Sequence, residues 1–247
     1  MLLALRRWFL IDCPAFLGVP SHENQLRLTP LRGNVADFPG QRLKWVDGFY
    51  PEPDLMREIA LRSDYYIPKP YYGYRTTKGF MPKGTLERIE NAFGLTDIKL
   101  LETQKRSTHF YTSLSKGEQA VEFNAHIDFG RDDSYPSFSL VVYLAPNAPP
   151  RAGTGIYRHK RTGIWQEATK LDAQRASCSL RALNKQLDDD SSHRRLWELL
   201  DVCDNVYNRA VLFPSWYYHS SCLEFGSKPE NGKLYQAFFM KARMRER

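Results

Sequence analysis

The stretch from Phe123 to Gly130, Phe-Asn-Ala-His-Ile-Asp-Phe-Gly, holds the residues of this sequence best suited to metal chemistry. His126 and Asp128 are two positions apart, and residues with this spacing in an extended strand point to the same side. An imidazole and a carboxylate placed in this way can bind one metal ion. The same spacing also suits a histidine that is only hydrogen-bonded to a neighbouring aspartate, so the pair by itself leaves both interpretations open.

A second histidine favours the metal interpretation. The apolar stretch 208–214 ends in a turn at Pro214, and His219 follows five residues later. Two neutral imidazoles and one carboxylate form the facial triad that leaves positions on iron(II) open for a chelating cosubstrate and oxygen, whereas zinc more often occupies a closed tetrahedral site. We therefore predict that His126, Asp128 and His219 bind one iron(II) ion and are the catalytic residues.

These motifs, together with the later Gly232-Lys233 pair, resemble those of the iron(II)/2-oxoglutarate-dependent dioxygenase superfamily. Longer stretches at 139–144, 153–160 and 232–239 resemble a little-characterised bacterial branch of it. The resemblance extends over about residues 45–241 and implies a double-stranded β-helix, which is a jelly roll of the cupin type. It also implies an enzyme that uses oxygen and 2-oxoglutarate to hydroxylate a substrate.

The resemblance assigns the cosubstrate to Lys233, which follows His219 by fourteen residues and would bind the distal carboxylate of 2-oxoglutarate. Superfamily members more often have arginine there, which pairs with a carboxylate through two hydrogen bonds, whereas lysine acts as a point charge. Tyr235 lies two residues further on, hence on the same strand face, and would donate to the same carboxylate. The alternative for Lys233 is an exposed strand lysine.

Further polar residues near these motifs are weaker candidates. The other cosubstrate-binding candidates are Asn124, Tyr111 and Tyr143. A role in core packing would explain each of them equally well. The substrate-binding candidates are Arg158, His159, Tyr74 and Arg75. His159 also competes as the third metal ligand, but we favour His219 because it ends an apolar strand in the place that the fold requires. The segments 65–80 and 160–207 would cover the mouth of the barrel and select the substrate.

The hydrophobic pattern indicates the elements that would position these side chains. Apolar residues at helical spacing predict helices at 51–62 and 83–93, the second closed by Gly94. After Thr96 the period changes to two. Strands are predicted at 44–50, 99–103, 107–113, 120–124, 137–144, 155–159, 209–213 and 234–241.

The chain is therefore expected to be mainly β with flanking helices, in one domain over residues 1–247. Residues 1–95 would form an irregular lead with supporting helices, and residues 96–241 the jelly-roll core. A polar, helix-prone stretch would form a helical insertion at about 165–205.

Composition agrees with a folded protein and excludes several classes. The chain has 247 residues, of which 42% are hydrophobic, so a sizeable core is available and disorder is not expected. No window of 18 uninterrupted apolar residues exists, which argues against a membrane span. Four widely separated cysteines without a CxxC pair predict reduced thiols and hence the cytoplasm.

The net charge of +7 and the isoelectric point near 9.2 permit an anionic partner without requiring one. Residues 151–195 hold ten Lys or Arg against five Asp or Glu. A solvated face explains this excess, and no nucleic-acid-binding motif is present, so nucleic acid is not an expected partner.

Two other functions compete with the hydroxylase. One is a cupin-type metal protein that uses no 2-oxoglutarate, and the other is an oxygenase that modifies nucleic acid through the basic surface. The expected substrate is an amino acid, a peptidyl side chain or a natural-product intermediate. The sequence does not determine the oligomeric state.

Overall fold

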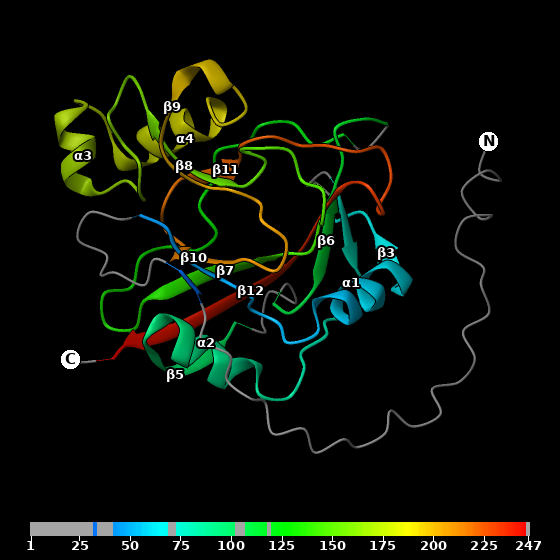
Figure 1. The fold of residues 1–247 in the computed structure, drawn as a ribbon. Helices are drawn as coiled ribbons and strands as arrows, with labels where there is room; N and C mark the ends of the chain where they lie inside the picture. The colour runs from blue at the N-terminus through cyan, green and yellow to red at the C-terminus, as the bar shows by residue number, and fades with distance from the viewer. Residues whose placement is uncertain (1–31, 34–41, 69–72, 102–106, 118–119, 246–247) are drawn as a thin grey trace. The chain divides into compact units, whose positions relative to one another are not determined.

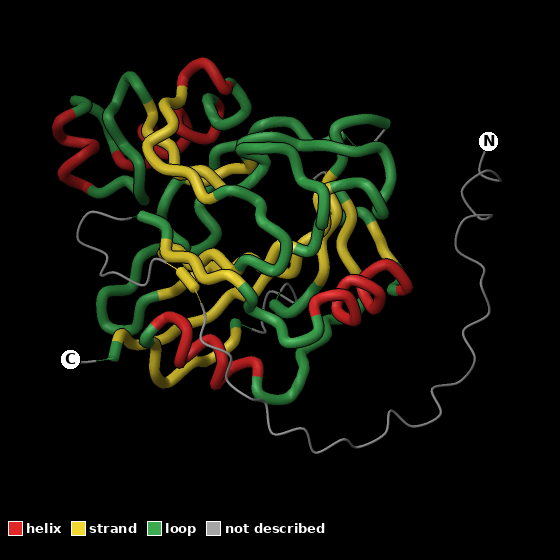
Figure 2. The backbone as a smooth tube through the Cα atoms, viewed as in Figure 1, coloured by secondary structure: helices red, strands yellow, loops and turns green. Residues whose placement is uncertain are grey.

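The computed structural model describes residues 32–33, 42–68, 73–101, 107–117 and 120–245. Within these ranges the chain forms two antiparallel sheets, with helices outside them (Figure 1, Figure 2). The prediction that residues 1–247 make one domain stays a prediction, because residues 1–31 and 34–41 lie outside the described ranges.

The larger sheet has nine strands. Eight of them lie side by side in the order β1-β2-β10-β7-β12-β6-β4-β3, and β5 also pairs with β12. Their bounds in that order are Arg32–Gly33, Lys44–Asp47, Ala210–Pro214, Ser137–Tyr143, Lys233–Met244, Phe110–Ser113, Tyr74–Thr76 and Tyr65–Tyr66, with β5 at Leu95–Leu100.

The smaller sheet has the order β11-β8-β9, with bounds His219–Ser221, Thr154–His159 and Trp197–Cys203. Residues 121–125 form no helix or strand and lead to its open edge, where His126 forms an isolated antiparallel bridge with His219. The backbone N–H of each residue donates to the carbonyl of the other, at 3.0 and 2.9 Å. This bridge adds a fourth, short member to the sheet.

The route of the chain between the two sheets makes the fold a jelly roll. After β6 in the larger sheet, the chain passes to the His126 bridge in the smaller sheet and returns to β7. It then forms β8 and β9 in the smaller sheet, β10 in the larger, β11 in the smaller and β12 in the larger. This alternation is the double-stranded β-helix, and it confirms the predicted fold class.

The period of two in β12 divides its side chains between two environments. Leu234, Phe238 and Met240 belong to the main hydrophobic cluster, which they share with residues of α1 (Pro53–Arg62) and α2 (Thr85–Phe93). Tyr235 points to the other face, where it packs with residues of both sheets. The face of the larger sheet that carries Tyr235 is called the inner face below.

The two predicted helices and most predicted strands are confirmed. Gly94 closes α2 in the left-handed conformation, with φ of +66°, where a side chain would be strained. The sharp turn starts β5 directly at Leu95, earlier than the predicted 99. At 120–124 the structure has only a bridge at Ala120 and no strand, so that prediction is wrong in detail.

The predicted insertion at about 165–205 is helical only in part. It contains α3 (Lys170–Arg175) and α4 (Leu180–Asp189), followed by the short 3-10 turn Arg194–Leu196. Residues from Trp197 onward form β9, which pairs with β8 along its length. Leu196, Leu199 and Leu200 have the spacing of a helix, but this segment instead forms hydrogen bonds with the edge of β8, which would otherwise be unpaired.

Phe238→Ala is expected to lower the free energy of unfolding by about 3–5 kcal/mol, because the Phe238 ring is fully buried and its removal leaves a cavity. Equilibrium urea unfolding measures this change. The control is Leu171→Ala on α3, whose side chain is 53% exposed, and it should change the free energy by no more than about 0.5 kcal/mol. Equal effects of the two substitutions would contradict this assignment of the core.

Candidate metal centre

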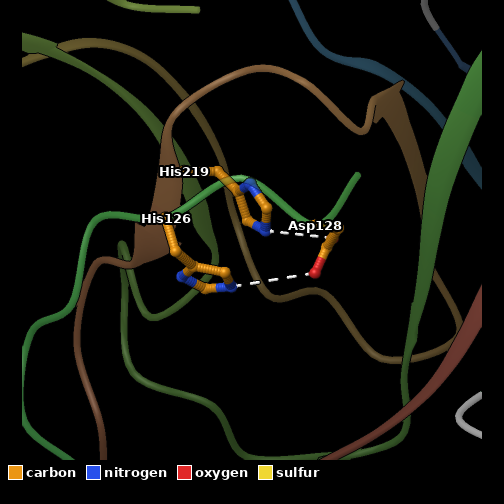
Figure 3. A group of neighbouring side chains, drawn as sticks. All are labelled: His126, Asp128 and His219. Carbon is orange, nitrogen blue, oxygen red and sulfur yellow. Dashed lines mark ion pairs between the residues drawn. The ribbon is translucent and has the colours of Figure 1, made fainter. Parts of the chain in front are cut away.

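Three side chains from two strand segments meet at the open edge of the smaller sheet (Figure 3). His126 forms the bridge to the smaller sheet, Asp128 lies in the bend that follows, and His219 begins β11. One ligand atom from each residue lies within 4.8 Å of the others. Nε2 of His219 is 3.3 Å from Oδ2 of Asp128, and Nε2 of His126 is 3.8 Å from Oδ1.

Both imidazoles are oriented by the backbone. Nδ1 of His126 lies 2.9 Å from the carbonyl oxygen of Asn124, and Nδ1 of His219 lies 2.9 Å from that of Tyr217. A carbonyl oxygen accepts only, so Nδ1 of each ring is the protonated nitrogen in these bonds. Each Nε2 of the neutral ring therefore keeps a lone pair directed at the third residue, as metal-binding histidines require.

Asp128 supplies the negative charge of the group. Its side chain is 7% exposed and accepts a hydrogen bond of 2.7 Å from the hydroxyl of Ser139, which also lies 2.8 Å from the hydroxyl of Ser215. Burial by itself raises the pKa of the carboxyl, but the positive charge that His219 and His126 carry when protonated, together with the Ser139 hydroxyl, outweighs it and holds the pKa below its usual range. The group is thus a carboxylate at neutral pH.

The donor set fits a divalent transition metal. Two ligand atoms that bind one ion at right angles lie about 3 Å apart, given bonds of about 2.1 Å. The His219–Asp128 pair is close to this spacing. The His126 ring is 45% exposed, so it has room to move the few tenths of an ångström that would bring its Nε2 to the same spacing from Asp128. Two nitrogens and one oxygen on one side of an ion leave its opposite side for other ligands.

Lys233 is also buried, at the start of β12, and its side chain is turned toward the smaller sheet. Its ammonium donates to the carbonyl of Gly153 at 3.1 Å and to the hydroxyl of Ser221. Among the described residues, no carboxylate lies within 4.0 Å of this nitrogen. Burial lowers the pKa of Lys233, and the charge of Glu224 opposes this effect only in part.

The predicted tyrosines lie next to one another on the inner face. Tyr235 is opposite Tyr111 on one side and Tyr143 on the other. The rings of Tyr111 and Tyr235 stack at 5.3 Å, and the Tyr143 hydroxyl is 2.6 Å from that of Thr154 on β8. Burial raises the pKa of Tyr143 and of Tyr235 well above the usual value, so both remain protonated donors.

The other predicted residues lie apart from the metal ligands or act through the backbone. His159 is buried between Thr162, 2.9 Å from Nδ1, and Asp190, 3.2 Å from Nε2, so both of its nitrogens are engaged away from Asp128. Arg158 pairs with Glu198 at 2.6 Å on the smaller sheet. The Asn124 side chain is exposed, and this residue contributes its carbonyl to His126.

The two candidates on β4 point to opposite faces. Tyr74 is paired with Thr112 and Arg75 with Tyr111, so alternation places Arg75 on the inner face with Tyr111 and Tyr74 on the helix side. Among the four residues predicted to bind substrate, Arg75 is the one in line with the inner-face tyrosines.

Sequence reasoning missed the residues that support this group. The Ser139 hydroxyl donates to the carboxylate of Asp128 and is itself bonded to the Ser215 hydroxyl, Ser221 accepts from Lys233, and Glu224 receives a bond of 2.6 Å from Ser113. Only Ser221 had a usable signal, because it lies two residues after His219 and so shares its strand face. The serines on β7 and after β10 look like ordinary strand residues in the sequence.

The sequence matches the profile of a family described as a family of unknown function (DUF6445) over residues 34–240, which is most of the chain. The chain belongs to this family. No curated protein matches the chain. The DUF6445 region contains all residues of the candidate centre and both sheets except β1 and the last residues of β12.

Several solved structures resemble this DUF6445 protein at low identity. HygX from Streptomyces hygroscopicus with nickel and 2-oxoglutarate bound is 14% identical, with a TM-score of 0.46 and coverage of 81% of this chain and 82% of HygX. A Pseudomonas putida prolyl-4-hydroxylase is 15% identical (TM-score 0.38; 86% and 97% covered). SnoN, a non-heme alpha ketoglutarate dependent epimerase from nogalamycin biosynthesis, is 10% identical (0.46; 81% and 78%). The jelly-roll assignment rests on the strand order of this chain.

Two further predictions concern the environment of the protein. None of the helices in the described ranges is long and apolar enough to span a membrane. Cys178, Cys203 and Cys222 are free thiols, and Cys13 lies outside the described residues. The cytoplasmic location stays a prediction.

His219→Ala is expected to abolish stoichiometric binding of iron(II) or nickel(II), because it removes one of three converging ligand atoms. Anaerobic calorimetric titration of the dialysed protein measures this. His193→Ala, an exposed histidine outside the group, is the matched control and should bind metal as the unchanged protein does. His159→Asn tests the competing third ligand, and loss of metal in this variant but not in His219→Ala would contradict the assignment.

Proposed function

We propose that this protein is an iron(II)- and 2-oxoglutarate-dependent oxygenase that hydroxylates a small-molecule or peptidyl substrate. His126, Asp128 and His219 hold the iron, and Lys233 binds the distal carboxylate of 2-oxoglutarate. The observation that carries the proposal is the convergence of two backbone-oriented Nε2 atoms on one buried carboxylate. This donor set is typical of the facial triad of non-heme iron(II) oxygenases.

The position of Lys233 relative to the triad fits a ligand that spans from the ion to the lysine. The Lys233 ammonium bonds to Ser221, and Ser221 lies two residues after His219 on the same face of β11. Two residues along a strand cover about 6.5–7 Å. A five-carbon dicarboxylate that chelates an ion through its 2-oxo acid end has the right length to place its other carboxylate near the lysine.

The charge of Lys233 supports the same assignment. A buried ammonium is costly unless an anion compensates it, and two neutral oxygen acceptors do so only in part. A ligand carboxylate would supply the missing charge and restore the pKa that burial lowers. An ammonium has three donors, and Gly153 and Ser221 use two of them, so one is left for the ligand.

When bound, iron and 2-oxoglutarate supply the oxidising chemistry: one oxygen atom of O2 enters the substrate and the other enters succinate as carbon dioxide leaves. The chain itself contributes position and charge. Ser139 fixes Asp128, the carbonyls of Asn124 and Tyr217 fix the imidazoles, and Lys233 with neighbouring tyrosine hydroxyls orients the cosubstrate. Apolar side chains of both sheets, such as Ile156 and Phe213, limit water on the inner side.

Lys233→Met is expected to weaken 2-oxoglutarate binding by about 10- to 100-fold, since a hydrogen bond to a charged group contributes about 1.5–3 kcal/mol. The measurement is an anaerobic titration of the iron(II)-loaded protein with 2-oxoglutarate, followed by the weak visible charge-transfer band of the complex. Lys233→Arg keeps the charge and should retain most of the affinity. Iron affinity itself should stay within twofold of the unchanged protein.

Lys241→Met is the matched control, because Lys241 lies on the same strand and pairs with Asp132 at 2.8 Å at the protein surface. It should leave the titration unchanged. If the unchanged protein binds iron(II) but shows no band with 2-oxoglutarate, the cupin-type metal protein becomes the better description. Unchanged affinity in Lys233→Met would remove the assigned role of this lysine.

A further inference from the structure

A row of polar and aromatic side chains crosses the inner face of the larger sheet. Strand register places Tyr66 opposite Arg75, Arg75 opposite Tyr111, and Tyr111 opposite Tyr235. Directly opposite residues in neighbouring strands point to the same face, so the four side chains form one line from the sheet edge to its centre. Tyr66, Arg75 and Tyr111 belong neither to the group of three metal-ligand candidates nor to the Lys233 site.

Arg75 is the one cation of this row, and its partners are phenols. Its guanidinium donates to the hydroxyl of Tyr66 and also bonds to Tyr111, and it lies 5.0 Å from the centre of the Tyr66 ring. In the part of the chain that the structure describes, no carboxylate lies within 4.0 Å of this guanidinium. Its Nε is buried and has no hydrogen-bond partner among these residues.

A half-buried guanidinium usually has a carboxylate or carbonyl partner for each side of its fork, and Arg75 has neither at its Nε among the described residues. Five N–H donors arranged as a rigid fork match two oxygens of a carboxylate or phosphate. Two other arginines that are at least half-buried have such partners: Arg209 pairs with Asp47 at 2.6 Å, and Arg88 donates to the carbonyls of Phe49 and Gly48. Arg42 also has a buried Nε without a hydrogen-bond partner among the described residues, but its guanidinium lies over the Trp165 ring and outside the row. Arg75 thus keeps donor capacity for an oxyanion.

The row ends beside the candidate metal centre. Tyr235 packs against a cluster that contains Ile156 of β8, and Ile156 lies directly opposite His219 in the register of the smaller sheet. Strands are spaced by about 4.8 Å, and β4 is two strands from β12, so Arg75 sits about 10 Å from Tyr235 along the row. This separation suits a second molecule, bound between the arginine and the ion.

We propose that Arg75, held by Tyr66 and Tyr111, binds an oxyanion group of the substrate, so that the substrate is an acid or a phosphate ester. This rests on the proposed oxygenase function. Lys233 and Arg75 are then separate anchors, the first for the cosubstrate and the second for the substrate. The Tyr111 ring stacks on Tyr235 and lies between Arg75 and the candidate metal centre, so a bound substrate would lie against it.

Calorimetric titration of the full-length protein, loaded with nickel(II) and 2-oxoglutarate to prevent turnover, tests this. The probes are a panel of N-acetyl amino acids, their uncharged carboxamides, and N-acetyl-O-phosphoserine amide, which carries a phosphate without a free carboxylate. The variants are Arg75→Gln and, as matched control, Arg158→Gln, whose guanidinium already pairs with Glu198. Thermal unfolding midpoints verify that both variants fold.

At least one acid or phosphate ester should bind tenfold or more tightly than its neutral counterpart. Arg75→Gln should remove this difference, with unchanged affinity for the carboxamide and for 2-oxoglutarate within twofold, and Arg158→Gln should behave as the unchanged protein. A preference for the carboxylate or for the phosphate identifies the source of the oxyanion. Arg75→Lys, which keeps the charge but loses the fork, should fall between the two.

The proposal is wrong if no oxyanion binds better than its neutral counterpart, or if the preference survives in Arg75→Gln. It is also wrong if Arg75→Gln loses 2-oxoglutarate instead, because Arg75 would then belong to the cosubstrate site. Failure of the oxygenase function looks different: the unchanged protein would bind no 2-oxoglutarate with nickel, whether or not an oxyanion still depends on Arg75.

Discussion

The pairing of His126 with His219 is the interaction on which the candidate centre depends. These residues exchange two backbone hydrogen bonds and thereby close the edge of the smaller sheet. The same bonds place the two imidazoles side by side, with ring centres 4.4 Å apart, and one ligand atom of Asp128 lies within 4.8 Å of both. Because the backbone performs the alignment, the side chains need only short-range hydrogen bonds to reach a metal-binding orientation.

Two buried charges, Asp128 and Lys233, lie near this pairing. Asp128 is a buried carboxylate that accepts a hydrogen bond from Ser139, and the Lys233 ammonium donates to the carbonyl of Gly153 and to the hydroxyl of Ser221 at the end of β11. Among the described residues, Asp128 and Lys233 form no ion pair with each other, which agrees with the proposed ligand that has a chelating end and a negative end. Burying two separate charges carries a desolvation free energy, which ligands of opposite charge would offset.

The alternation of side chains in the larger sheet separates its packed face from the face that carries the proposed ligand-binding residues. One face of β12 packs on α1 and α2 in the main hydrophobic cluster, while the inner face carries Lys233, Tyr235 and, two strands away, Arg75. Sheet register therefore fixes the spacing of the two cations relative to the centre more tightly than a loop would. The insertion with α3 and α4 packs on the smaller sheet through Leu183, Leu187 and Trp197.

The two flanking helices and the His126/Asp128/His219 group could be predicted from the sequence alone, because period, spacing and residue type are local properties, and the jelly roll was implied by the resemblance of these motifs to a known superfamily. The sequence could not show that β9 leaves the helical pattern for the edge of β8, that His159 is engaged by Asp190, or that Ser139 and Ser215 support Asp128. Nor could it separate Arg75 from Arg158, since both are strand arginines near tyrosines. Only strand register decided that one faces the inner row and the other meets Glu198, because register joins residues that are distant along the chain.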